Sequence, residues 1–356
     1  MKKHNFSAGP CILPQEVFEK SAQAILNFNN LGLSLLEISH RSKDFVTVIE
    51  NARTLVLELL DLQNKGYQVL FLHGGASLEF LMVPYNLMKV NGKAAYLDTG
   101  TWASGAIKEA KHFGETIVVA SSQSDSYTYI PKKYTIPADA DYFHCTSNNT
   151  IYGTQMKMFP KTNIPLVCDM SSDIFSRALD FSQFDIIYAG AQKNMGPAGV
   201  TLVVVKESIL GKTGRTIPAM LDYREHIAKE SMYNTPPVFS IYTSLLTLQW
   251  LQKQGGIAAI EKINNQKAAL LYAEIDRNTL FKGTAAPEDR SIMNVTFQLK
   301  DLSHQAKFDK LWQQAGISGL NGHRSVGGYR ASLYNALPIE SVQVLVDVMT
   351  QLENQL

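Results

Sequence analysis

One lysine stands where an amine nucleophile could be held. Lys193 lies in FDIIYAGAQKNMGPAGVTLVVV (184–205), in a short glycine-flanked connection between two apolar runs that we predict to be buried strands. Burial disfavours the charged ammonium form, which lowers the pKa of a lysine and makes its amine a nucleophile toward an aldehyde. From this segment alone, a surface hairpin lysine that reaches into solvent is equally compatible. The small residues Gly190, Ala191 and Gly196 would let a planar ring approach the backbone.

A carboxylate ends another predicted strand. Asp169 closes PLVCD (165–169), and open α/β sheets bind ligands at the carboxyl ends of their strands. An aspartate followed by SSD is as often a turn or helix-capping residue. In a pyridoxal phosphate enzyme, however, a carboxylate keeps the pyridinium nitrogen protonated. One helix-sized connection and one strand separate Asp169 from Lys193, so both side chains can face the same ring.

A glycine pair follows a third predicted strand and opens a helix. YQVLFL (67–72) leads through HGGAS into an amphipathic pattern near Leu78. The N–H groups of Ala76 and Ser77, and the Ser77 hydroxyl, would lie at a helix N-terminus, where the dipole favours a phosphate. Plain helix capping explains the same residues, and the pattern matches neither nucleotide-binding glycine motif.

Two more side chains fall at predicted strand ends. Trp102 follows AAYLD and a Gly-Thr turn, where it could stack on a ring, although core packing or plain exposure is the commoner role of a tryptophan. Thr150 lies beyond DYFHC and could donate its hydroxyl to a ring oxygen. Both predictions depend on the strands meeting at one sheet edge.

Two basic clusters flank this region. HRSKDF contains His40 and Arg41, and GHRSVGGYRAS contains His323, Arg324 and Arg330. The planar guanidinium forms paired, charge-assisted hydrogen bonds with carboxylates and phosphates. Exposed basic residues are commonly only solvated, but their glycine-rich setting favours anion binding here.

The elements that must position these residues indicate an α/β fold. Short apolar runs alternate with helical patterns through the first two-thirds of the chain, which predicts βαβ units and a central, mostly parallel sheet covered by helices. Several runs are continuously apolar, as strands covered on both faces should be. The predicted strands are 67–72, 94–98, 116–120, 165–169, 184–189 and 200–205, and the helical patterns between them include 78–89 and 102–113.

The texture changes near Gly255-Gly256. A long helical stretch, the strand candidate 291–299 and two further helices around a glycine-rich turn predict a smaller C-terminal α+β domain. We therefore divide the chain into a large domain (14–255) and a small domain (256–356). The segment 1–13 is expected to pack near the active site or the small domain.

Composition excludes several classes of protein. The chain has 356 residues, and its formal charge of +1 gives no field that would attract nucleic acid or an anionic membrane. Cys11, Cys145 and Cys168 form neither a disulfide framework nor a metal-binding spacing. No apolar run reaches membrane-spanning length, and the N-terminus lacks the apolar core of a signal peptide. We therefore expect a cytoplasmic protein without a metal site.

At these positions the chain resembles the phosphoserine aminotransferase family, within class V of the pyridoxal-phosphate-dependent aminotransferases of fold type I. The matching segments occur in family order over nearly the whole chain: NFSAGP, HRSKDF, GGAS, GTWASGA, SNNTIYGT, DMSSD, AGAQKNMGPAGVT, NTPPVFS and GHRSVGGYRASLYNALP. Two departures are modest. SNNT replaces a segment in which many members carry an acidic residue before the threonine, and GGAS is one of several versions of the phosphate turn.

The resemblance implies a role for each matching residue. Lys193 would bind the cofactor aldehyde covalently, Asp169 would pair with the ring nitrogen, and both would be catalytic. The other cofactor-binding residues would be Ala76, Ser77 and Gln192 at the phosphate, Trp102 on the ring, Thr150 near it, and Asn234 and Thr235, which would reach the phosphate in the neighbouring subunit of a homodimer. Substrate carboxylate would bind Arg41 and Arg330, substrate phosphate would bind His40, His323 and Arg324, and Ser7 would also contact substrate.

The implied reaction is reversible transamination between 3-phosphohydroxypyruvate and L-glutamate, which gives O-phospho-L-serine and 2-oxoglutarate in serine biosynthesis. Family members also commonly form 4-phosphohydroxy-L-threonine on the route to vitamin B6. Another class V activity is an alternative, either a small-amino-acid:glyoxylate aminotransferase or a cysteine desulfurase. A noncatalytic anion-binding or scaffold protein is a third, in which the strand-end residues only cap helices.

Overall fold

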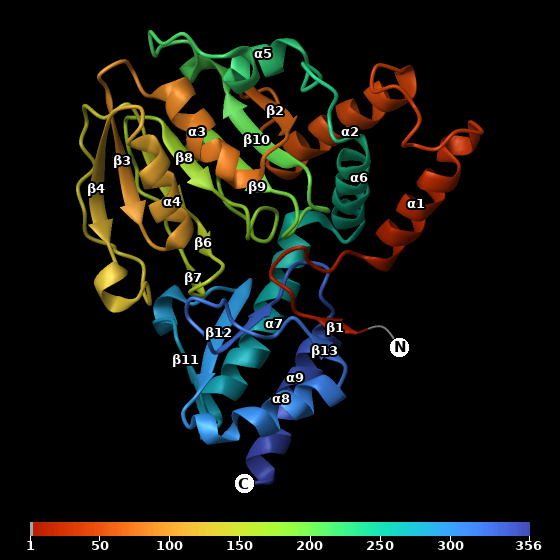
Figure 1. Cartoon of the computed structure of the whole chain (residues 1–356), viewed down its shortest axis with the longest axis vertical. Helices are drawn as coiled ribbons and strands as arrows, with labels where there is room; N and C mark the ends of the chain where they lie inside the picture. The colour runs from red at the N-terminus through yellow and green to blue at the C-terminus, as the bar shows by residue number, and fades with distance from the viewer. Residues whose placement is uncertain (1–2) are drawn as a thin grey trace.

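The apolar runs of the first two-thirds form one seven-stranded sheet in the computed structural model, which describes residues 3–356. The strand order is β2-β10-β9-β8-β5-β3-β4 (Figure 1). The strands are β2 (Tyr67–Leu72), β3 (Lys93–Asp98), β4 (Glu115–Ser121), β5 (Phe143–Thr146), β8 (Leu166–Asp169), β9 (Ile186–Gly190) and β10 (Thr201–Lys206). The sequence predicted these strands with ends that differ by no more than two residues.

Strand β10 gives the sheet its mixed character. It pairs antiparallel with both β2 and β9, whereas the remaining pairs of this sheet are parallel. The connection that carries Lys193 is too short for a crossover, which takes about a dozen residues or more, so the chain must return antiparallel beside β9. The mostly parallel α/β sheet is confirmed. Strands β2, β3, β5, β8 and β9 consequently all end at the same edge.

Helices cover both faces of the sheet (Figure 1). Helices α3 (Gly75–Leu87) and α4 (Thr101–Ala110) pack on one face, and α2 (Lys43–Leu59) and α6 (Val238–Lys253) pack on the other. Helix α1 (Gln15–Leu26) lies against α6, and α5 (Tyr223–Ala228) lies near β2. In β10, Val203 and Val205 pack in the core under α3 and α4, whereas Leu202 and Val204 pack in the core under α2 and α6. Both faces of this strand are therefore buried, which explains its unbroken apolar run.

Two elements have features that the apolar pattern and the connection length did not specify. Strand β4 lies at the sheet edge, and its Val118 is 45% exposed, so it is not covered on both faces. The connection 170–185 between β8 and β9 contains turns and one 3-10 helix, η3 (Phe181–Gln183), in place of a helix-sized crossover. Its Ser and Asp side chains bond to nearby backbone, as Ser176 Oγ does to Asp173 O at 2.6 Å, and such bonds compete with helix formation.

The C-terminal part has its own core of helices and a three-stranded antiparallel sheet. Its elements are α7 (Gly256–Arg277), β11 (Phe281–Gly283), β12 (Asn294–Leu299), α8 (Gln305–Gln314), β13 (Ile317–Ser318), β14 (Tyr329–Ser332) and α9 (Ile339–Asn354). The remaining short elements are β6 (Asn148–Asn149), β7 (Thr154–Gln155), η1 (Phe28–Asn30), η2 (Gln123–Asp125), η4 (Glu207–Ile209), η5 (Ala219–Leu221), η6 (Pro287–Asp289) and η7 (Leu302–His304). The division of the chain after residue 255 stays a prediction.

The N-terminal segment contacts both parts of the molecule. Strand β1 (His4–Asn5) pairs in parallel with β13, and Cys11 N donates to Gln192 O at 3.0 Å. Residues 1 and 2 of the predicted 1–13 segment lie outside the described residues. Within residues 3–356, none of the helices combines the length and the apolarity that crossing a membrane requires.

Candidate active site

The residues predicted to bind the cofactor and to act in catalysis lie at one edge of the large sheet. Because β2, β3, β5, β8 and β9 run in the same direction, the segments that follow them lie side by side. These segments carry the glycine pair of α3, Trp102 in the first turn of α4, Thr150, Asp169 and Lys193. The edge is therefore the first candidate for an active site.

The amine of Lys193 lies at the centre of this group. Its Nζ donates to Thr150 Oγ1 at 2.8 Å and lies 5.5 Å from the centroid of the Trp102 ring. Desolvation lowers the pKa of Lys193 to about 8, an effect that the negative charge of Asp169 opposes and the positive charge of Arg330 reinforces. A larger fraction of the amine than in an ordinary lysine is consequently uncharged near neutral pH and can act as a nucleophile.

One carboxylate oxygen of Asp169 accepts a hydrogen bond from the backbone. Ser171 N donates to Asp169 Oδ1 at 2.9 Å, and the residue is only 4% exposed. Desolvation raises the pKa of the carboxyl group, and the charge of Lys193 opposes this shift. The Ser171 hydroxyl accepts from Gly190 N at 3.1 Å, so the same serine also fixes the end of the strand that leads to Lys193.

The predicted phosphate turn has the required backbone. Gly74 and Gly75 take φ values of +90° and +65°, which favour glycine. A Cβ at Gly74 would lie 2.5 Å from Leu78 Cβ, whereas a Cβ at Gly75 would meet no atom within 4 Å. The first N–H groups of α3 have no acceptor within the helix, so Ala76 and Ser77 lie where an anion can be bound beside open space.

These residues fit pyridoxal phosphate. Lys193 would bind its aldehyde carbon, Asp169 would face its ring nitrogen, and Trp102 offers a ring face close to the amine. The α3 turn would hold its phosphate. The Gln192 side chain folds over Gly190, where an added Cβ would lie 2.8 Å from Gln192 Oε1, so that glycine leaves the side chain the space it occupies beside Lys193.

The second basic cluster lies near Lys193. Arg330 extends from β14, its Nε is buried without a hydrogen-bond partner, and its positive charge acts on both Lys193 and His323. Desolvation and the charges of Arg330 and Arg324 lower the pKa of His323. The structure thus groups these three basic residues with one another, and the charge of Arg330 reaches the amine.

Four other predicted residues are not brought to the amine within this chain. Arg41 Nε donates to His40 Nε2 at 3.2 Å, and no described contact joins either residue to Lys193. Asn234 and Thr235 are exposed, and Thr235 O accepts from His73 Nε2 at 3.1 Å, next to the phosphate turn.

Ser7 also lacks a described contact with Lys193. Its N–H donates to Asn5 Oδ1 at 3.0 Å, and a Cβ added at Gly319 would strike its side chain and backbone. Its contact with substrate stays a prediction.

A buried ion pair beneath the site was missed in the sequence. Asp173 accepts from Arg177 at 3.0 Å and from Gln155 at 3.2 Å, and it also accepts from Ser147 Oγ. Ser147 N donates to Asp169 O at 2.9 Å, so the pair supports the catalytic strand end. The spacing of Asp and Arg in DIFSR was the available signal, and the sequence alone assigned no role to either residue.

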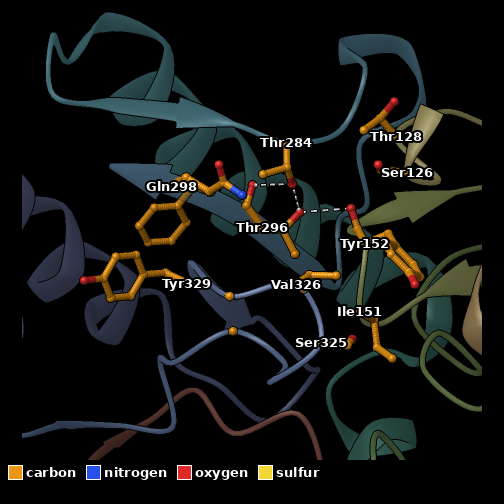
Figure 2. A pocket seen from close by; sticks show the side chains of 13 residues that line it. Ser126, Thr128, Ile151, Tyr152, Thr284, Thr296, Gln298, Ser325, Val326 and Tyr329 are labelled. Carbon is orange, nitrogen blue, oxygen red and sulfur yellow. Dashed lines mark hydrogen bonds between the residues drawn. The ribbon is translucent and has the colours of Figure 1, made fainter. Parts of the chain in front are cut away.

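A cavity adjoins the segment that follows Thr150. It has a volume of about 300 Å³ and lies between the turn after Thr150 and the C-terminal sheet. Figure 2 shows Thr284 and Thr296, whose hydroxyls are 2.6 Å apart, on one wall and Ser325 and Val326 on another. The lining residues are uncharged, and Gly322 and Ser325 among them flank His323 and Arg324 in the chain.

Comparisons with known proteins agree with this geometry. Residues 3–345 match the model of the family described as aminotransferase class V. A phosphoserine aminotransferase of Flavobacterium psychrophilum is 79% identical over 356 residues, with 100% of both chains covered. The structure of phosphoserine aminotransferase from Bacillus circulans subsp. alkalophilus is 43% identical and superimposes with a TM-score of 0.96, covering 99% of each chain. That of a PLP-bound phosphoserine aminotransferase from Trichomonas vaginalis is 36% identical, with a TM-score of 0.93 and coverage of 98% of this chain and 100% of that one.

Proposed function

This chain belongs to the class V aminotransferase family, and we propose that it is a pyridoxal-phosphate-dependent phosphoserine aminotransferase. The proposed reaction is the reversible transfer of an amino group between L-glutamate and 3-phosphohydroxypyruvate. The observation that carries the proposal is the desolvated amine of Lys193. This amine donates a hydrogen bond to Thr150 and lies near the Trp102 ring, and the charge of Asp169 opposes the lowering of its pKa.

The cofactor, when bound, supplies an electron sink for the carbanion that forms at the substrate α-carbon. Lys193 Nζ takes the proton from that carbon and returns a proton during the transfer, for which a depressed pKa suits it. The Asp169 carboxylate would hold the cofactor's ring nitrogen protonated, which strengthens the electron sink that the ring supplies. Thr150 orients the amine through its 2.8 Å hydrogen bond.

The basic residues account for a substrate with two anionic groups. Arg330, whose charge acts on Lys193, is suited to the α-carboxylate that both amino acids carry. His323 and Arg324 flank it and would bind the substrate phosphate. A glyoxylate-dependent enzyme that acts on alanine needs only a carboxylate site, so this cluster favours the phosphorylated substrate.

The cysteines disfavour a desulfurase. Cys145 and Cys168 are fully buried in β5 and β8, with their sulfur atoms 3.8 Å apart. Burial raises the pKa of Cys11 to about 12 and thereby suppresses its thiolate. Among these residues none is a mobile, exposed thiol that could attack a cysteine substrate.

We propose that the active form is a homodimer. Asn234 and Thr235 are exposed beside the chain's own phosphate turn, where a second copy could share them. Leu26 is 77% exposed and Leu36 is 62% exposed, in the segment that leads to His40 and Arg41. Covering these apolar side chains would favour association of two copies.

Spectra of the purified protein with bound cofactor test the function. Adding glutamate should remove the cofactor's aldehyde absorbance, and adding 3-phosphohydroxypyruvate should restore it with formation of phosphoserine.

Two further measurements separate the alternatives. The Lys193→Ala variant should bind cofactor without turnover, and the unmodified enzyme should react far faster with phosphoserine than with alanine. A colourless protein to which borohydride cannot attach the cofactor at Lys193 would favour the noncatalytic alternative. The oxo acid that corresponds to 4-phosphohydroxy-L-threonine should be assayed in parallel, to measure whether the enzyme also uses this second substrate.

A further inference from the structure

Three buried asparagines fasten one turn beneath the active site. The turn 174–176 lies in the connection that follows Asp169, and its three successive carbonyl groups each accept from a different asparagine. The pairs are Asn194 Nδ2 with Ile174 O at 2.6 Å, Asn335 Nδ2 with Phe175 O at 2.9 Å, and Asn264 Nδ2 with Ser176 O at 2.9 Å. We call Asn194, Asn264 and Asn335 the amide clamp.

The members of the amide clamp also bond to one another. Asn335 N donates to Asn194 Oδ1 at 2.9 Å, and Asn264 Nδ2 donates to Asn335 Oδ1 at 2.8 Å. Asn264 is fully buried, and the other two are 6% exposed. Buried amides linked in this way define one arrangement of the backbone segments that they join.

The fastened turn has a backbone conformation that needs support. Phe175 is 1% exposed and has a φ of +60°, in the left-handed region that bulky side chains avoid. Such conformations persist only where the surrounding structure holds them, and they concentrate at functional sites. The hydrogen bond from Asn335 to Phe175 O acts directly on this residue.

Each part of the amide clamp adjoins a residue of the proposed reaction. Asn194 directly follows Lys193, the turn follows Asp169, and Asn335 follows the strand that carries Arg330. Asn264 lies on α7, and Lys267, one turn later, donates to the carbonyls of Leu333, Tyr334 and Leu337. Helix α7 therefore holds both the amide clamp and the segment that contains Asn335.

We propose that the amide clamp consists of positioning residues, which set Lys193 against Asp169 and tie both to the strand of Arg330. The proposal rests on the proposed function, because it concerns the geometry of that reaction. Without the clamp, the turn at Phe175 relaxes, and the amine and the carboxylate lose their fixed relation. Small displacements of catalytic groups reduce rates strongly while the fold persists.

The test compares Asn194→Ala and Asn335→Ala with a matched control. Asn278→Ala removes an equally buried asparagine whose Nδ2 donates to Glu274 Oε1 at 2.8 Å and to Met349 O at 3.3 Å, away from the turn. For each holoenzyme we would measure kcat and KM for phosphoserine and the urea midpoint. For each apoprotein we would measure the pH dependence of borohydride trapping of an aldehyde at Lys193.

We expect both clamp variants to lower kcat at least about tenfold, and Asn335→Ala also to raise KM because it loosens the Arg330 strand. The trapping midpoint should move to higher pH, because a relaxed turn admits water to the amine. Asn278→Ala should lose stability while kcat and the midpoint stay unchanged.

The proposal is overturned if both clamp variants lose only stability, as the control does. If Asn194→Ala fails to fold, Asn335→Ala decides, because it keeps both hydrogen bonds of the Asn194 side chain. Absence of transamination in the unmodified protein would reject the proposed function, but the trapping midpoint would still test the amide clamp.

Discussion

At the scale of single residues, the chemistry depends on opposing influences on one amine. Desolvation and the charge of Arg330 disfavour the protonated form of Lys193, whereas the charge of Asp169 favours it. The balance leaves the pKa at about 8, well below the ordinary value of about 10.4 for lysine. The same amine can therefore act as a nucleophile and as a proton carrier.

This balance predicts a pH profile for the apoprotein. A lysine reacts with an aldehyde as the free amine, so borohydride trapping at Lys193 should rise with pH and reach half its maximum near pH 8. Asp169→Asn removes the charge that supports protonation and should move the midpoint to lower pH. Peptide mass spectrometry measures the trapped fraction, and an unstructured lysine peptide serves as the reference. A midpoint near 10, or an upward shift in Asp169→Asn, would contradict the assignment.

At the scale of elements, the start of α3 combines a steric requirement with an open space. Gly74 and Gly75 both have left-handed φ values, but only Gly74 packs against a neighbour, Leu78. The two glycines therefore have different roles. One is required by the helix, and the other lies beside the space in which the phosphate is proposed.

The two glycines should respond differently to substitution. Gly74→Ala combines backbone strain with a contact at 2.5 Å and should lower the free energy of unfolding by about 2 kcal/mol or more. Gly75→Ala should cost about 1 kcal/mol from backbone strain alone. However, its methyl group would enter the open space and weaken cofactor binding by about tenfold or more. Urea unfolding and fluorescence titration of the apoproteins measure both effects. Unchanged cofactor affinity in Gly75→Ala would contradict a phosphate at this turn.

The sequence predicts the elements whose cause is local. Continuous apolar runs mark the buried strands, and residues at their ends, such as Asp169 and Lys193, meet because the strands are parallel. The approach of Arg330 to Lys193 depends on how the C-terminal sheet packs, which no local pattern encodes. Asn194 and Asn335 look like ordinary turn residues in the sequence, and only the fold reveals that they bind successive carbonyls.

At the scale of the whole molecule, the active-site edge faces the C-terminal part of the same chain (Figure 1). That part supplies Arg330 to the site, and the N-terminal segment adds a backbone bond from Cys11 to Gln192. His40, Arg41, Asn234 and Thr235 remain apart from the amine in the single chain. A complete site therefore requires a second copy if these residues act as proposed.

Complementation between two inactive variants tests this sharing. One chain carries Lys193→Ala, and the other carries Asn234→Ala and Thr235→Ala. In a mixed dimer, the second chain keeps its lysine and receives intact Asn234 and Thr235 from the first, so one of the two sites is whole. Random exchange of two-fold symmetric dimers should restore about a quarter of the unmodified activity. Each variant alone provides the control, and size-exclusion chromatography with light scattering verifies that dimers form. If the mixture forms dimers and stays inactive, the two residues serve the site of their own chain, next to His73, and the shared site is wrong.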